Sequence, residues 1–168
     1  MSITANPSAP VSQTIVKGAA HSVPAVFPAQ TTIQTTSDLG YAGIVSPTQA
    51  WELFQAGTAV IVDVRSKEEL HFVGRVPGTL HVAWATGTAL NRNPRFVREL
   101  EAKLNKSQTI LLLCRSGKRS AEAAIAATKA GFKQVYNIAQ GFEGDLDPAN
   151  QRGHLGGWRV ANLPWEQD

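Results

Sequence analysis

An apolar run that ends abruptly at a cysteine constrains the fold of this chain more than any other stretch. The run Thr109–Leu113 leads into Cys114, a cationic, glycine-containing turn follows, and an alanine-rich segment extends from Arg119 or Ser120 to Ala130. Continuous apolar residues are typical of a strand covered on both faces, and strand, turn and helix in this order form half of a βαβ unit. We therefore expect Cys114 at the mouth of a loop whose N–H groups and helix N-terminus stabilise negative charge.

Strands and helices alternate along the rest of the sequence. The expected strands are Ile44–Val45, Ala59–Val64, Thr79–Val82, Thr109–Leu113 and Gln134–Ile138. The expected helices are Pro47 to about Gln55, Ser66 to about Phe72, Pro94–Leu104 and the segment after the cysteine turn. This alternation predicts an α/β fold, a five-stranded parallel sheet with helices on both faces. Ligands of such sheets bind beyond the carboxyl ends of the strands, where Cys114 lies.

Two local signals mark the starts of helices. Ser46 precedes Pro47, which places a capping hydroxyl before a residue favoured in the first helical turn. Ser66 is followed by Glu69 at the spacing of a capping box. Both signals agree with the strand and helix order above.

The chain divides into a tail and one domain. Its 168 residues, 43% of them hydrophobic, suffice for one domain of ordinary size. Residues 1–39 are rich in Ser, Thr, Ala, Pro and Gln without periodicity, so we expect a flexible or partly ordered N-terminal tail. A docking segment is the alternative reading of the tail. Residues 40–168 form the expected domain.

Composition excludes several classes of protein. One cysteine cannot form an internal disulfide, and with scattered histidines it gives no zinc pattern, so we expect no metal and no cofactor. The net charge of +3 is modest, and the basic residues are densest beside Cys114, which argues for a small anionic substrate and against nucleic acid. No run approaches the roughly 18 apolar residues of a membrane span, and the N-terminus lacks the pattern of a secretory signal. The expected location is cytoplasmic.

Four motifs, in this order along the chain, resemble those of single-domain rhodaneses, sulfurtransferases of the thiosulfate type. The motifs are Ile61–Arg65, Gly74–Val82, Cys114–Ser120 and the glycine and tryptophan elements Gly141 and Gly156–Trp158. The resemblance covers about Ile44 to Trp165 and implies the rhodanese-like fold. The family often has Gly-His where this chain has Gly74-Arg75. The polar stretch Glu143–Gly153 separates the last elements.

The loop suits Cys114 as a nucleophile. A helix N-terminus and adjacent cations favour the thiolate, and the cationic side chains argue against an inert core cysteine. A thiolate can attack the sulfane sulfur of thiosulfate or a similar donor, release sulfite and keep a persulfide. A thiophilic acceptor such as cyanide, a thiol or a protein cysteine then removes that sulfur.

We expect the residues that follow Cys114 to bind the substrate. Arg115 and Lys118 attract the donor's sulfonate oxygens, while Arg119 and the loop amides steady the anionic sulfur. Gly117 lets the backbone curl inward. The full expected loop is Arg115, Ser116, Gly117, Lys118, Arg119 and Ser120.

Two further residues are expected to support the site. The resemblance implies that Asp63 and Arg65 lie close to it, and we interpret them as an ion pair that ties a second strand end to the active loop. A catalytic pair is the competing interpretation. A histidine base for Cys114 among His71, His81 and His154 is less favoured, because a helix, a strand and a surface loop separate the three. Trp84 follows a strand end and is a candidate wall of the site.

Other functions compete with sulfur transfer. A cysteine-dependent phosphatase would need its arginine one position after Arg119, where this chain has Ser120. The lysine of a nucleotide-binding P-loop would need glycines at a spacing that is missing before Lys118. A redox sensor would need a resolving cysteine, and the chain has none. A persulfide carrier or interaction module stays open as the alternative.

Overall fold

The computed structural model describes residues 38–168. Residues 1–37 of the expected tail lie outside the described residues. The strands in chain order are β1 (Gly43–Val45), β2 (Val60–Asp63), β3 (Leu80–His81), β4 (Ala85–Thr86), β5 (Asn91–Arg92), β6 (Thr109–Leu113) and β7 (Gln134–Ile138). The helices are α1 (Pro47–Gln55), α2 (Lys67–Val73), α3 (Phe96–Lys103) and α4 (Lys118–Lys129).

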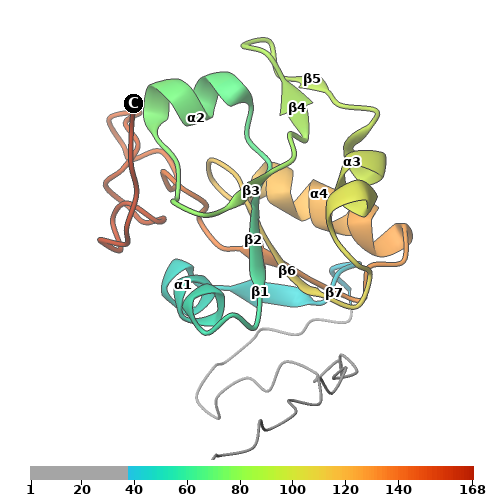
Figure 1. Cartoon of the computed structure of the whole chain (residues 1–168). Helices are drawn as coiled ribbons and strands as arrows, with labels where there is room; N and C mark the ends of the chain where they lie inside the picture. The colour runs from blue at the N-terminus through green and yellow to red at the C-terminus, as the bar shows by residue number, and fades with distance from the viewer. Residues whose placement is uncertain (1–37) are drawn as a thin grey trace, which may run out of the picture.

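Five of the strands form one parallel sheet, which confirms the predicted fold class (Figure 1). Their order across the sheet is β1-β7-β6-β2-β3, so β6 lies at the centre. The register pairs Asp63 at the end of β2 with Leu113 at the end of β6. Asp63 and Cys114 therefore lie side by side at the carboxyl end of the sheet.

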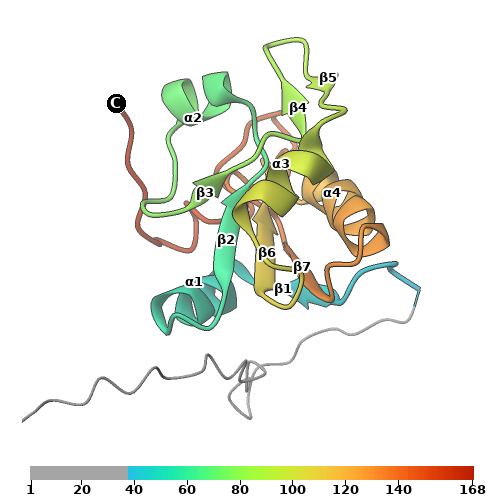
Figure 2. The ribbon, with the colours of Figure 1, turned by 45° about the vertical axis from the view of Figure 1, so that its right-hand side comes forward.

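Side chains alternate between the two faces of the sheet, and each face has its own apolar cluster. Ile110, Leu112 and Cys114 pack with residues of α3 and α4. Leu111 and Leu113 pack on the other face, with residues of α1 and with Trp158 of the C-terminal segment. Figure 2 shows α3 and α4 on one side of the sheet, and α1 on the other. Since Cys114 continues the alternation of β6, its side chain points beneath α4.

Helix α2 covers neither face. None of its residues is buried, and it lies above the carboxyl edge of the sheet (Figure 1). The capping box of Ser66 and Glu69 is present as predicted, with Ser66 N–H donating to the Glu69 carboxylate at 3.1 Å. This helix thus stands over the end of the sheet where Cys114 emerges.

The antiparallel pair β4–β5 was not expected. Ala85 pairs with Arg92 and Thr86 with Asn91. Each strand has two residues, which is too short for a recognisable alternation of polar and apolar side chains.

The C-terminal segment closes the face that α1 leaves open. Trp158 is fully buried, and its ring meets that of Trp51 edge-on at 5.8 Å between centroids. Arg75 and Glu166 form a β-bridge between the loop after α2 and the end of the chain. Within residues 38–168, no helix is long and apolar enough to cross a bilayer.

Candidate active site

Cys114 follows β6 directly and has 1% of its surface exposed. Its Sγ accepts a hydrogen bond from the backbone N–H of Gly117 at 3.1 Å, and the Ser120 hydroxyl lies at the same distance, 3.1 Å. We had taken the cationic loop as an argument against an inert core cysteine, yet the cysteine side chain itself is buried. The sulfur has hydrocarbon on one side, and the N–H of Gly117 and the hydroxyl group of Ser120 on the other.

The loop curves around the sulfur because its carbonyl groups are held outside. The carbonyls of Cys114 and Arg115 accept from the N–H groups of Phe142 and Glu143, at 2.8 and 2.9 Å. Gly117 has φ +91°, a left-handed conformation that favours glycine, and it is the N-cap of α4. Its N–H consequently points at Sγ, where the positive end of the α4 dipole favours negative charge.

A glycine behind the loop permits this close approach. A Cβ on Gly141 would collide with the carbonyl oxygen of Cys114 and would lie 2.7 Å from the backbone of Arg115 and Ser116. The sequence marked Gly141 by the resemblance alone. The structure gives its physical role, which is to leave room for the loop.

The loop cations differ in what they contact. Nη1 and Nη2 of Arg119 donate to the Glu69 carboxylate, at 2.7 and 2.6 Å. This pairing, against the desolvation of burial, raises the pKa of Arg119, and the charge of Cys114 adds to the same effect. The Nη donors of Arg119 are thus engaged by Glu69 of α2. Lys118 is exposed, while Arg115 and Ser116 are half-buried.

Glu69 was recognised in the sequence only as a capping residue. Burial would raise the pKa of its carboxyl, but hydrogen bonds from Arg119 and Ser66 outweigh burial, and the pKa lies below its usual range. A carboxylate that both caps α2 and binds Arg119 ties α2 to the start of α4.

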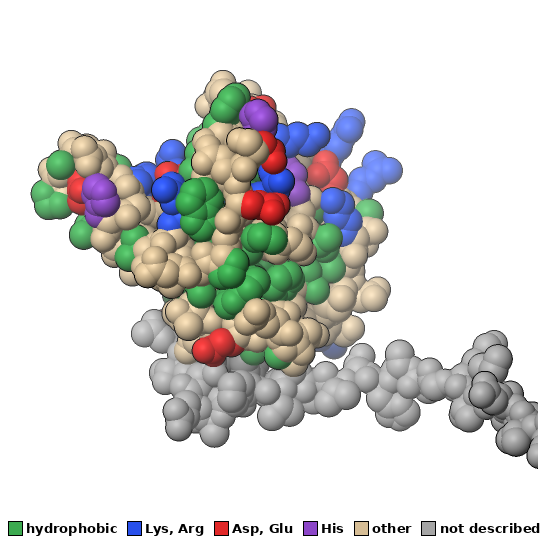
Figure 3. Space-filling view, turned by 60° about the vertical axis from the view of Figure 1, so that its left-hand side comes forward, with side chains coloured by type: hydrophobic (Ala, Val, Ile, Leu, Met, Phe, Trp, Pro, Cys, Tyr) green, Lys and Arg blue, Asp and Glu red, His purple; other side chains and the backbone are tan. Residues whose placement is uncertain are grey.

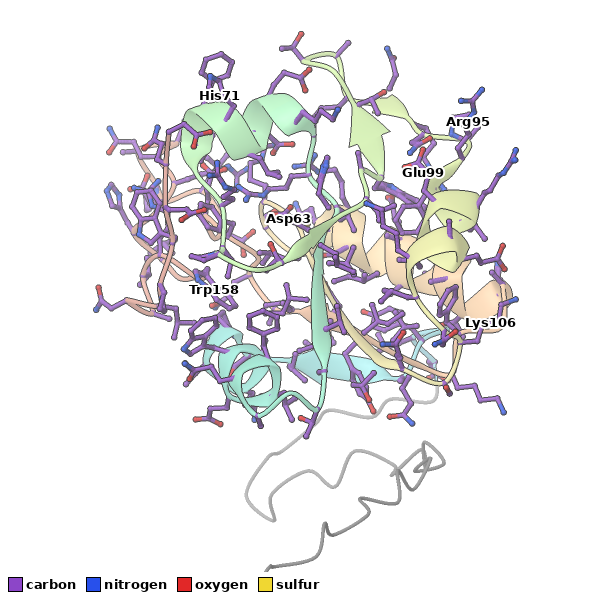
Figure 4. All side chains as sticks on the ribbon, in the orientation of Figure 1. Asp63, His71, Arg95, Glu99, Lys106 and Trp158 are labelled. Atoms are coloured by element: carbon purple, nitrogen blue, oxygen red, sulfur yellow. The ribbon has the colours of Figure 1, made fainter. Side chains whose placement is uncertain are left out.

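Asp63 and Arg65 form the predicted ion pair, fully buried, with Arg65 Nη2 2.6 Å from Asp63 Oδ2. The same nitrogen donates to the carbonyl of Gly74 at 2.9 Å, and the guanidinium lies over the Phe142 ring at 4.1 Å. Figure 4 shows Asp63 at the carboxyl end of β2. The pair therefore ties the end of β2 to the segments around Gly74 and Phe142. We had expected it to contact the loop directly, but the connection to the loop runs through Phe142.

Asn137 joins the site without having been expected there. Its Oδ1 is 2.6 Å from Ser120 Oγ, and its Nδ2 donates to the carbonyl of Gly117 at 3.1 Å. Tyr41 shares a further side-chain hydrogen bond with it. The available signal in the sequence was an amide in the middle of an otherwise buried strand, Gln134–Ile138.

The histidines and Trp84 have other partners. His71 points away from the sheet on the outer side of α2 and lies near Asp168 (Figure 4). His81 bonds the carbonyl of Arg65, and His154 bonds Asp147. Trp84 is buried against Phe96. No group of His, Cys, Asp and Glu in the described part of the chain is arranged to hold a metal ion.

Comparison with known proteins identifies the class that this fold and site define. The family model described as "Rhodanese-like domain" matches residues 46–146. A crystal structure titled Rv0390 from M. tuberculosis is 42% identical, with a TM-score of 0.69, over 76% of this chain and 99% of that one. The chain belongs to the rhodanese-like family.

Two curated relatives extend the comparison. A protein of Rickettsia rickettsii, named "Uncharacterized protein RP600 homolog", is 36% identical over 73% of this chain and 95% of its own length. The thiosulfate sulfurtransferase GlpE of Coxiella burnetii is 32% identical over 59% of this chain and 82% of its own length. The family and its sulfurtransferase members support a sulfurtransferase-family role for this chain.

Proposed function

We propose that this protein moves a sulfane sulfur from thiosulfate or a similar small anion to a thiophilic acceptor, through a persulfide on Cys114. The observation that carries the proposal is the position of Sγ, 3.1 Å from the N–H of Gly117 at the start of α4. An N–H group and a helix N-terminus stabilise a thiolate. The chain has a single cysteine, so the nucleophile is unambiguous.

The proposed reaction has two displacements. The Cys114 thiolate attacks the outer sulfur of thiosulfate, the S–S bond of the donor breaks, and sulfite leaves with the bonding electrons. The outer sulfur then carries the negative charge on the persulfide. Cyanide or a thiolate attacks that sulfur, the new C–S or S–S bond forms, and the Cys114 thiolate is released.

The burial of the sulfur limits the size of the substrates that can reach it. With Cys114 at 1% exposure, the reacting end of a donor has to be small. Exposed Lys118, in the first turn of α4, supplies positive charge for the donor's sulfonate oxygens. The charge of Arg119 is offset by its pair with Glu69, which leaves Lys118 as the exposed cation of the loop.

The test is the formation of thiocyanate from thiosulfate and cyanide. The unchanged protein is expected to turn over, and Cys114→Ser to lose all activity because a hydroxyl replaces the thiolate. Lys129→Ala, at the exposed far end of α4, is the control for a surface change. Equal activity in Cys114→Ser and the unchanged protein would end the proposal.

A persulfide carrier is the second candidate, and exposed apolar side chains favour it. Phe72, at 70% exposure, and Leu155, at 56%, lie in α2 and the C-terminal segment. Figure 3 shows hydrophobic side chains gathered on one face beside charged ones. A carrier would form a lasting persulfide with slow turnover to cyanide, whereas an enzyme would form it transiently with fast turnover.

A further inference from the structure

The hydroxyl of Ser120 lies between two acceptors and has one proton to donate. Its Oγ is 3.1 Å from Cys114 Sγ and 2.6 Å from Asn137 Oδ1. Ser120 is fully buried and Asn137 is 6% exposed, so bulk water does not compete for either. A hydroxyl donates one hydrogen bond at a time. The direction of this proton therefore decides whether the sulfur faces a hydrogen-bond donor or an oxygen lone pair.

The orientation of Asn137 is fixed by Gly117. A carbonyl oxygen accepts and cannot donate, so the atom of Asn137 that lies 3.1 Å from Gly117 O has to be the amide nitrogen. Oδ1 then faces Ser120. Two oxygens only 2.6 Å apart need a proton between them, and Oδ1 has none to give. Ser120 consequently donates to Asn137.

A hydroxyl that donates to Asn137 presents a lone pair to Cys114. That arrangement suits an S–H group, which donates to Ser120 Oγ, and it opposes a thiolate, which needs donors. A thiolate gains the hydroxyl as a donor only after the O–H bond turns from Oδ1 to Sγ.

We propose that Asn137 is a positioning residue that competes with Cys114 for the proton of Ser120, and so makes formation of the thiolate less favourable than the loop alone would make it. This inference refines the site of the proposed sulfur transfer, whose nucleophile is that thiolate. The only cysteine of the chain therefore forms its thiolate more readily after the hydroxyl has turned to Sγ.

Other charges surround the sulfur and are the same in every variant considered. The loop has Arg115 and Lys118. The ion pair between Arg119 and Glu69 joins α4 to α2. The ion pair between Asp63 and Arg65 lies at the end of β2. Glu122 on α4 bonds Trp84, and Tyr41 ahead of β1 bonds Asn137. A comparison among variants of Asn137 and Ser120 holds all of them constant.

The experiment is a double-mutant cycle with Asn137→Leu, Ser120→Ala and the two combined. Leucine has about the shape of asparagine and makes no hydrogen bond, which limits cavity formation. The readout is the ultraviolet absorbance of the thiolate during a pH titration, taken as the difference from Cys114→Ser. We expect Asn137→Leu to lower the midpoint by about one pH unit, the size of a hydrogen bond to a charged group.

The Ser120→Ala background separates proton competition from a structural effect. With no hydroxyl to redirect, adding Asn137→Leu is expected to leave the midpoint where Ser120→Ala alone places it. An unchanged midpoint in the single variant, or an equal fall in both backgrounds, overturns the inference. If Asn137→Leu does not fold, by near-ultraviolet circular dichroism, Asn137→Ala takes its place in the cycle. A predicted shift without any persulfide from thiosulfate would reject the proposed function while leaving this inference in place.

Discussion

At the scale of single residues, the sulfur atom of Cys114 is both buried among apolar side chains and hydrogen-bonded to a backbone N–H. Cys114 lies in the same apolar cluster as Ile110 and Leu112, yet receives the N–H of Gly117. The order of strand, cysteine and glycine turn predicted that amides of the loop would face the sulfur, but it did not single out the N–H of Gly117. The burial of the Cys114 side chain follows from the alternation along β6, which points it to the α4 side of the sheet.

Lys118 provides a residue-scale prediction about the donor. It is the exposed cation of the loop, so Lys118→Ala should raise the KM for thiosulfate about fivefold and weaken its dependence on salt, because salt screens such an attraction. Steady-state kinetics at two ionic strengths measure both. Lys129→Ala, an exposed lysine at the other end of α4, should change neither. An unaltered KM in Lys118→Ala would remove this residue from donor binding.

The Asp63–Arg65 pair makes a second prediction, about stability. Both side chains are fully buried, so Asp63→Ala leaves a charged guanidinium without its partner and should lower the free energy of unfolding by about 3–5 kcal/mol. Replacing both residues, with Asp63→Leu and Arg65→Met, should cost less than the single change. Urea unfolding measures each variant. A double variant less stable than Asp63→Ala would contradict the account of this pair as a buried ion pair.

At the scale of elements, the site depends on segments far apart in the chain. The sequence predicted β6, α4 and the parallel sheet, because apolar runs mark the strands and an alanine-rich run marks α4. It did not predict that the Glu69 of one capping box binds Arg119, or that Asn137 of β7 reaches Ser120. Those contacts arise from the packing of elements, and no local pattern encodes which side chains will meet.

Gly141 tests how the segment after β7 shapes the loop. Gly141→Ala puts a Cβ against the Cys114 carbonyl and should reduce the rate of sulfur transfer about 10²-fold, as expected for a misplaced reacting group. Gly153→Ala is the matched control, because Gly153 also has a positive φ, +84°, but nothing lies within 4 Å of its added Cβ. Backbone strain is thus common to both variants. Equal rates in the two would show that the collision does not matter to the loop.

The Glu69–Arg119 pair predicts how the stability of the protein depends on pH. The pKa of Glu69 is lowered in the fold from an ordinary value of 4.5, so its contribution to stability is complete above that value. The contribution disappears as the pH falls through the lower, folded pKa. Glu69→Gln should therefore be less stable than the unchanged protein near neutral pH, by about 1.5–3 kcal/mol, and this difference should shrink in acid.

Urea unfolding at a series of pH values measures that difference. The control is Glu166→Gln, which removes a carboxylate paired with Arg75 at 49% exposure. A surface pair of this kind contributes about 0–1 kcal/mol. A difference for Glu69→Gln that stays constant down to low pH would contradict the pairing.

At the scale of the whole molecule, two apolar clusters pack on opposite faces of the sheet. The α3 and α4 side contains Cys114, and the α1 side contains Trp158 and Phe142, whose N–H holds the loop carbonyl. The sequence predicted the sheet and both layers of helices. It did not define the role of the C-terminal segment, because a stretch rich in glycine and polar residues has no periodicity from which its position on a face follows.

The central claim is that Cys114 carries the transferred sulfur, and the mass of the intact protein tests it most directly. After exposure to thiosulfate and removal of excess donor, the mass should rise by one sulfur atom and return to its starting value when cyanide is added. Cys114→Ser should gain nothing under the same conditions. An unchanged mass in the native protein, or an equal gain in Cys114→Ser, would contradict the claim.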